Sequence, residues 1–152
     1  MRKIQFIQPV GQIVVGPYSP AVIAGDTVYV SGQIPRTSAG KIISDSIENS
    51  TTCALENLRS VLNAAGCSIT DVVKTTIFMQ DLADFEGMNT AYAAFFGAHR
   101  PARTTVQVAK LPVGARIEID CIAMRQNRQA NADHRRELLS STEGKEYESR
   151  TD

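Results

Sequence analysis

The sequence predicts an α+β fold in which one β-sheet carries two helices on a single face. Segments with strand periodicity and segments with helix periodicity follow one another in the order β-β-β-α-β-α-β-β. Both helical segments have an apolar side that must be buried against another element. The chain has 152 residues, 43% of them hydrophobic, which suits one domain built around one core.

The first three strands are expected near the N-terminus. Residues 3–8 are interpreted as an edge strand that opens the sheet. Residues 21–24 and 27–32 flank Gly25 and Asp26, a pair that suits a tight hairpin turn. The loop at 35–40, which contains Ser, Thr and Gly, then separates this hairpin from the first helix.

The two helices are predicted at residues 46–65 and 82–96. Apolar residues of the first fall on one face at spacings of three and four: Leu55, Leu58, Leu62 and Ala65. Gly66 stands where a glycine commonly ends a helix. The apolar stripe of the second consists of Phe85, Met88, Tyr92, Phe95 and Phe96. Asn89 lies on or beside this stripe, where a polar side chain needs a partner.

Three more strands complete the predicted sheet. Residues 72–79 are rich in β-branched side chains and are bounded by aspartates. In residues 103–108, Arg103 shares one face with Thr105 and Gln107, while Thr104, Val106 and Val108 share the other. In residues 116–124, Glu118 shares a face with Arg116 and Asp120, opposite Ile117, Ile119 and Cys121.

The composition divides the chain into a domain at residues 1–124 and a charged tail at 125–152. The tail has six basic and six acidic residues and few large apolar ones, so it is expected to be disordered or to form a frayed helix. Lys plus Arg and Asp plus Glu number 16 each, which argues against nucleic-acid binding through a basic surface. The three cysteines form no CxxC pair, and no apolar run suggests a signal or membrane segment, so a cytoplasmic protein is expected.

Well-known catalytic and metal-binding motifs are missing from the sequence. It contains no GxGxxG, Walker A, HExxH or GxSxG pattern, and its two histidines, His99 and His134, form no recognisable group with the cysteines. Chemistry is therefore sought among polar residues at strand ends and on strand faces.

Arg103 and Glu118 are the principal candidates. The guanidinium of Arg103, at a strand start, can bind a carboxylate through two parallel hydrogen bonds. A carboxyl group framed by two isoleucines, as in Glu118, can have a raised pKa and donate a proton or hold a water. The simpler alternatives are that both face solvent, or that they form an ion pair with each other.

Tyr18 and Gly32 are weaker candidates. The phenol of Tyr18, which follows Gly16 and Pro17 in a loop, can lie over a ligand or pack at a subunit contact. Gly32 can let a ligand approach the backbone closely, or can simply mark a bulge or turn.

Five blocks of the sequence, in the same order and spacing, resemble the RidA (YjgF) family of reactive intermediate deaminases. They are VGPYSPAV at 15–22, VYVSGQIP at 28–35, ENLRSVLNAAG at 56–66, VVKTTIFMQDLADFEGMNTAYAAFF at 72–96, and RPARTTVQVAKLPVGARIEIDCIA at 100–123. The resemblance covers about residues 3–124 and leaves out the tail.

The resemblance implies a chorismate-mutase-like fold, a curved mixed sheet backed by two helices, and a homotrimer with sites between subunits. It implies hydrolysis of 2-imino acids, the tautomers of enamines such as 2-aminoacrylate, to 2-keto acids and ammonia. No metal or organic cofactor is expected, and the implied partners are a small imino or keto acid and further copies of the chain, with neither nucleic acid nor membrane.

The resemblance also implies roles for six residues. Arg103, in the PAR motif, would bind the substrate carboxylate, and Glu118, in the IEI motif, would position the attacking water. Four residues would line the pocket: Tyr18, Gly32, Asn89 and Thr105. The family often has cysteine where this chain has Thr105, so a thiol can play no part at that position, although the backbone N–H and C=O there can still contact a ligand.

Two other functions stay open at this stage. A non-enzymatic module that binds small carboxylates would use Arg103 equally well but would not need Glu118. An endoribonuclease or translation-inhibitor role, attributed to members of the family, fits poorly with the neutral net charge.

Overall fold

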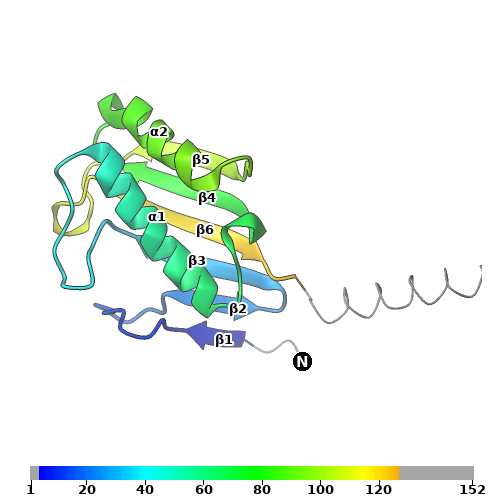
Figure 1. Ribbon diagram of the computed structural model, residues 1–152. Coiled ribbons are helices and arrows are strands. Elements are labelled where there is room, and N and C mark those ends of the chain that lie inside the picture. The colour runs from blue at the N-terminus through cyan, green and yellow to red at the C-terminus, as the bar shows by residue number, and fades with distance from the viewer. Residues whose placement is uncertain (1–3, 127–152) are drawn as a thin grey trace, which may run out of the picture.

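The computed structural model describes residues 4–126, which form one six-stranded sheet in the order β1-β2-β3-β6-β4-β5 (Figure 1). The predicted tail lies outside these residues, apart from its first two positions. The strands are β1 (Ile4–Ile7), β2 (Ala21–Ala24), β3 (Thr27–Gln33), β4 (Val72–Met79), β5 (Ala102–Gln107) and β6 (Ile117–Met124). The helices are α1 (Ile47–Ala64) and α2 (Phe85–Phe96), with short 3-10 turns at η1 (Ile69–Asp71), η2 (Leu82–Asp84) and η3 (Pro112–Gly114). The predicted α+β class and element order are thereby confirmed.

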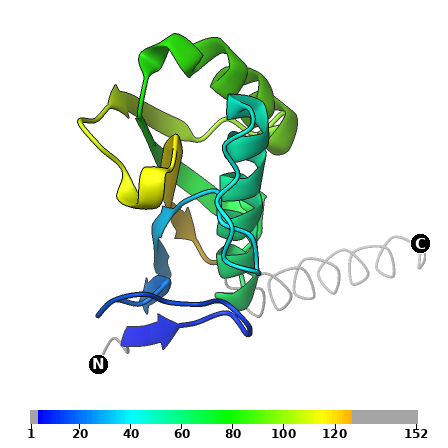
Figure 2. The ribbon, with the colours of Figure 1, turned by 90° about the vertical axis from the view of Figure 1, so that its left-hand side faces the viewer.

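Both helices pack on the same face of the sheet, and among residues 4–126 no helix covers the other face (Figure 2). Inward-pointing residues of the four central strands and the apolar faces of the helices make the core. Its largest fully buried side chains include Leu55, Leu58, Leu62, Ile77, Met79, Met88, Ile117 and Ile119. The sheet is mixed, because β4 and β5 are parallel while the other neighbouring strands are antiparallel.

Local interactions at residues 46 and 66 explain where helix α1 begins and ends. The hydroxyl of Ser46 accepts a hydrogen bond from the backbone N–H of Asn49 at 3.1 Å, satisfying one of the free donors of the first turn. The chain leaves the helix through Gly66, whose φ of +76° is unfavourable for residues with a side chain. The predicted glycine stop is therefore confirmed.

Two local features differ from the predicted elements. The second helix was expected to run as one piece from residue 82, but η2 precedes α2, and the Asp81 carboxylate accepts from the N–H of Ala83 at 2.8 Å. Strand β3 extends to Gln33, and its pairing with β6 shifts register between Val30 and Gln33. This irregularity re-aims the backbone around Gly32.

Within residues 4–126, neither helix combines the length and the apolar character needed to cross a bilayer.

Candidate active site

The six predicted site residues fall into two groups within one chain. Arg103, Asn89 and Thr105 gather at the edge of the sheet formed by β5, beneath α2. Tyr18, Gly32 and Glu118 lie toward the end of β3, and Glu118 points from the uncovered face. The sheet register establishes this separation.

The register places Arg103 on the helix-covered face. Arg103 pairs with Thr75 of β4, whose side chain is fully buried on that face. Glu118 pairs with Phe78, three residues further along β4. Because side chains alternate along a strand, residues three apart point to opposite faces, and so do Arg103 and Glu118. The ion pair between these two residues, one of the simpler alternatives, does not form within the chain.

Two aromatic rings of α2 lie against the guanidinium of Arg103. Its Cζ is 4.9 Å from the centroid of the Tyr92 ring and 5.7 Å from that of the Phe85 ring. A cation over the face of an aromatic ring is stabilised by the ring's electron density, without using the cation's hydrogen-bond donors. The fork of N–H groups on this exposed side chain is therefore left for another acceptor.

The charge of Arg103 has no acidic partner in the part of the chain that the structure describes. The ion pairs of residues 4–126 are Arg59 with Glu56 and Arg116 with Asp84. An exposed arginine held by aromatic faces and free of carboxylates can accept a carboxylate from a ligand in bidentate geometry.

Asn89 and Thr105 flank this arginine. Asn89 lies four residues after Phe85 and three before Tyr92, so helix geometry places it on the same face of α2 as the two rings. Thr105 follows Arg103 by two residues on the same face of β5, and its Oγ1 is buried with no hydrogen-bond partner among residues 4–126. Both predicted neighbours of Arg103 are thus near it, while their contacts with substrate stay a prediction.

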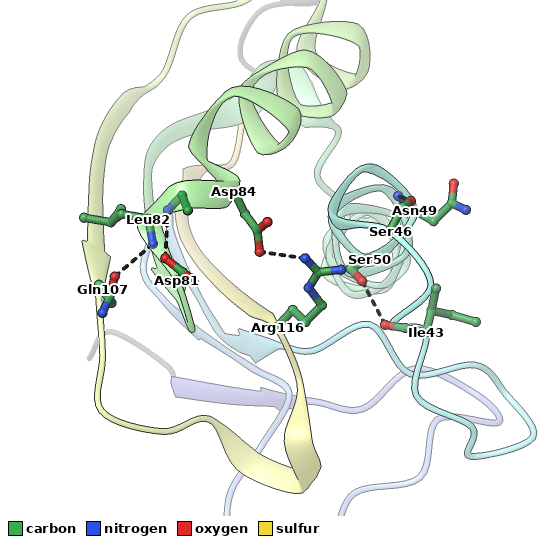
Figure 3. Close-up of polar contacts among 10 residues, drawn as sticks. Ile43, Ser46, Asn49, Ser50, Asp81, Leu82, Asp84, Gln107 and Arg116 are labelled. Atoms are coloured by element: carbon green, nitrogen blue, oxygen red, sulfur yellow. Dashed lines mark hydrogen bonds and ion pairs between the residues drawn. The ribbon is translucent and has the colours of Figure 1, made fainter.

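The turn η2, which leads directly into α2, is tied to β5 and to the residue that precedes β6 (Figure 3). The backbone N–H of Leu82 donates to Oε1 of Gln107 on β5 at 2.9 Å. Nη2 of Arg116, just before β6, donates to Oδ2 of Asp84 at 2.8 Å. These contacts set the height of α2 above the sheet edge that carries Arg103.

Glu118 packs directly against the backbone of Gly32. A Cβ atom on residue 32 would lie 2.7 Å from Cδ of Glu118, a distance that real Cβ contacts essentially never show. The glycine therefore makes room for the carboxyl group, a more specific role than the predicted close approach of a ligand. Burial, and secondly the nearby carboxylate of Asp120, raise the pKa of Glu118 above the usual range.

Tyr18 and Gly32 line one cavity of about 250 Å³. The cavity lies between the loop at residues 10–14, the end of β3, and the side of α1 that carries Asn57 and Ser60. The Tyr18 side chain is 53% exposed, so it has surface left for a ligand or another subunit. Arg103 does not line this cavity, which agrees with the separation of the two groups. Glu118, although it packs against Gly32, does not line the cavity either.

Within residues 4–126, the surroundings of His99 and Cys121 suit structural and not catalytic roles. Nε2 of His99 lies 2.7 Å from the carbonyl oxygen of Val72. Burial is the main cause that raises the pKa of Cys121 to about 12, so this thiol is protonated at neutral pH. His, Cys, Asp and Glu side chains of this part of the chain do not gather in groups that could hold a metal ion.

Sequence reasoning missed Tyr92 and Phe85 as members of the site, because they were assigned only to the apolar stripe of the second helix. Their spacing of seven residues with Asn89 between them is the signal that could have revealed a shared face. What that face covers depends on the packing of α2 over β5.

The chain is similar in sequence and in fold to known proteins of one family. The Endoribonuclease L-PSP family matches residues 11–125. The chain is 50% identical over 111 residues to the chloroplastic Reactive Intermediate Deaminase A of Arabidopsis thaliana, covering 71% of this chain and 58% of that one. It is 44% identical over 111 residues to the 2-iminobutanoate/2-iminopropanoate deaminase of Homo sapiens, covering 72% and 81%. The structure of E. coli TdcF with bound serine superposes with a TM-score of 0.75 at 38% identity, covering 80% and 99%.

Proposed function

The chain belongs to the RidA (YjgF) family of reactive intermediate deaminases, and on this basis we propose that it hydrolyses 2-imino acids to 2-keto acids and ammonia. Relatives at 41–50% identity carry the names of such deaminases. The observation that carries the proposal here is Arg103, an exposed guanidinium held over two aromatic rings and free of acidic partners among residues 4–126.

Arg103 acts as the carboxylate clamp of the proposed reaction. A 2-imino acid carries its carboxylate one bond from the electrophilic C2, so a bidentate contact fixes C2 as well as the acid group. Asn89 and Thr105 lie beside the arginine and complete the wall of this half of the site. TdcF, whose structure contains serine, is a relative that accommodates a small molecule with a carboxylate.

Glu118 acts on the water. Addition of water to the C2=N bond gives a carbinolamine, which loses ammonia to form the keto acid. Ionised Glu118 accepts one proton from the attacking water and returns it to the imine nitrogen, which gives the carbinolamine. It then accepts the hydroxyl proton of the carbinolamine and passes it to the amino nitrogen, so that the C–N bond breaks, C2=O forms and ammonia leaves. A pKa raised by burial and by Asp120 suits a carboxyl group that must take up a proton and release it again. The imine is already electrophilic, so orientation and one proton carrier can supply most of the acceleration.

The proposed site lies between subunits of a homotrimer. Arg103 and Glu118 point from opposite faces of one sheet, so a cleft that contains both needs residues from two copies. The uncovered face also has large apolar side chains to bury. Tyr29, Val106 and Met124 are 50%, 38% and 44% exposed there, and Phe6 on the edge strand is 73% exposed.

The proposal is tested by generating imines in place with an amino-acid oxidase and following keto-acid formation with and without the protein. Acceleration is expected for small aliphatic amino acids and should disappear in Arg103→Ala. If wild type gives no acceleration yet binds 2-oxobutanoate through Arg103, the cleft binds small carboxylates and the catalytic proposal is wrong.

A further inference from the structure

We propose that Tyr92 is a positioning residue for Arg103, with its ring locked by a buried hydrogen bond to Thr75 so that the guanidinium is held ready for a carboxylate. The inference rests on the proposed function only in taking Arg103 as the carboxylate-binding group. It assigns Tyr92 no contact with the substrate.

Tyr92 is restrained at both ends. Its side chain leaves α2 and is 7% exposed, and its ring lies 4.6 Å from that of Phe96. At the far end its hydroxyl is 2.8 Å from Oγ1 of Thr75, a residue with no solvent exposure on β4. A ring tied to a helix backbone and to a buried hydroxyl on a central strand has little freedom to move.

Burial also keeps the Tyr92 hydroxyl protonated. Burial is the largest influence on the phenol and raises its pKa, although the hydrogen bond with Thr75 and the charge of Arg103 oppose the effect. The neutral phenol therefore offers Arg103 a ring face and not a phenolate oxygen. A phenolate or carboxylate at this place would occupy the guanidinium donors that the ligand needs.

The Tyr92 ring limits the conformational freedom of the Arg103 side chain. Arg103 stands on an edge strand and is exposed, so its long side chain would otherwise sample many rotamers and lose entropy when a ligand binds. Contact with the Tyr92 ring at 4.9 Å narrows that range while the N–H fork stays free. Preorganisation of this kind improves affinity without a new contact to the ligand.

Phe85 supplies a natural comparison on the same helix. It also faces Arg103, at 5.7 Å, but it is 37% exposed and has no hydroxyl to anchor it. The tighter and anchored ring is therefore assigned the positioning role. The ties from Leu82 to Gln107 and from Asp84 to Arg116 keep α2 at the height that this contact requires (Figure 3).

The experiment measures binding of 2-oxobutanoate and of its neutral amide, 2-oxobutanamide, by calorimetry. The preference for the charged compound reports on Arg103 and needs no turnover. Tyr92→Leu should reduce this preference about tenfold, whereas Tyr92→Phe, which keeps the ring, should reduce it about twofold to threefold. Thr75→Val should match Tyr92→Phe, and the double variant should be no worse than either single one.

The controls separate positioning from general damage to the core. Val28→Ala, a fully buried change on β3, which β6 separates from the strand that anchors Tyr92, should lower the Tm but leave the preference for the carboxylate unchanged. In the Arg103→Ala background, Tyr92→Leu should alter the residual binding less than twofold, because it acts through the missing arginine. Equal losses from Tyr92→Leu with and without Arg103 would overturn the inference, as would wild type that binds neither compound.

An absence of imine hydrolysis alongside intact charge-dependent binding would count against the proposed function alone. The positioning role of Tyr92 would then still be supported by its effect on the binding preference.

Discussion

Arg103 and Glu118 belong to one sheet but have contrasting surroundings. Arg103 lies on the edge strand β5, exposed, beneath aromatic rings that leave its charge free for an anion. Glu118 lies on the central strand β6, half-buried against Gly32 and close to another carboxylate, in surroundings that disfavour its charge. The contrast teaches that one sheet can carry a cation and a carboxyl group on opposite faces, so that the proposed site needs a second copy of the chain to bring the two together.

The largest expected effect on activity comes from removing the guanidinium of Arg103. Arg103→Ala removes the two charge-assisted hydrogen bonds proposed to hold the substrate carboxylate, worth together about 3–4 kcal/mol, so kcat/KM for a 2-imino acid should fall about 100- to 1000-fold. Arg103→Lys should recover only part of the loss, because a point charge lacks the fork geometry. Steady-state kinetics with oxidase-generated imines measure both, and near-wild-type activity in Arg103→Ala would remove the clamp from the mechanism.

Mixed oligomers test whether the two halves meet between subunits. Arg103→Ala and Glu118→Gln chains are each expected to be nearly inactive when pure. Co-expressed in equal amounts, they should regain about a quarter of wild-type activity, because one site in four pairs an intact Arg103 with an intact Glu118 of a neighbour. Purified mixtures with two different tags measure this recovery. No recovery in verified mixed oligomers would require both residues to act from the same chain.

A smaller effect on activity is expected when a side chain at residue 32 displaces the carboxyl group of Glu118. Gly32→Ala places a methyl group 2.7 Å from Cδ of Glu118 and must displace the carboxyl group. We expect kcat to fall about tenfold, as catalytic groups shifted by around an ångström commonly lose that much or more. Binding of 2-oxobutanoate should change less than kcat, because Arg103, which supplies the proposed carboxylate contact, is unaltered. Adding Gly32→Ala to Glu118→Gln should cost no further activity.

The smallest effect concerns stability and pH. Glu118 has a raised pKa in the folded protein, so folding becomes less favourable as pH rises from the ordinary glutamate value of 4.5 through the folded value. Glu118→Gln, which cannot ionise, should therefore have a higher Tm than wild type at pH 7, and the difference should vanish below pH 4.5. Calorimetry across this range measures the difference. A variant less stable than wild type at pH 7 would contradict the assigned surroundings of Glu118.

Much of the fold could be predicted from local sequence. The spacing of Leu55, Leu58 and Leu62 marked one face of α1, and all three side chains are fully buried. Val72–Met79 was predicted with the boundaries that β4 has. The alternation that separates Arg103 from Val106, and Glu118 from Ile119, is also a local property of strands and holds in the sheet.

Only the tertiary structure decided which face of each strand meets the helices. The sequence alternation of β5 offered two faces, and the apolar Val106 suggested no reason for Arg103 to lie beneath α2. The parallel pairing of β5 with β4 aligned Arg103 with buried Thr75, while the antiparallel pairing of β6 aligned Glu118 with Phe78. These registers join segments far apart in the chain, so local periodicity carries no record of them.

The sequence by itself therefore determined the elements, their periodic faces and, through the resemblance, the residues to examine. Tertiary structure decided that Arg103 and Glu118 lie on opposite faces of the sheet. It also decided that Gly32 leaves room for the Glu118 carboxyl group and that the Tyr92 ring lies against the Arg103 guanidinium. The physical reason is that hydrophobic periodicity depends on neighbours within one turn or one strand, whereas strand order, register and helix height depend on packing between distant segments.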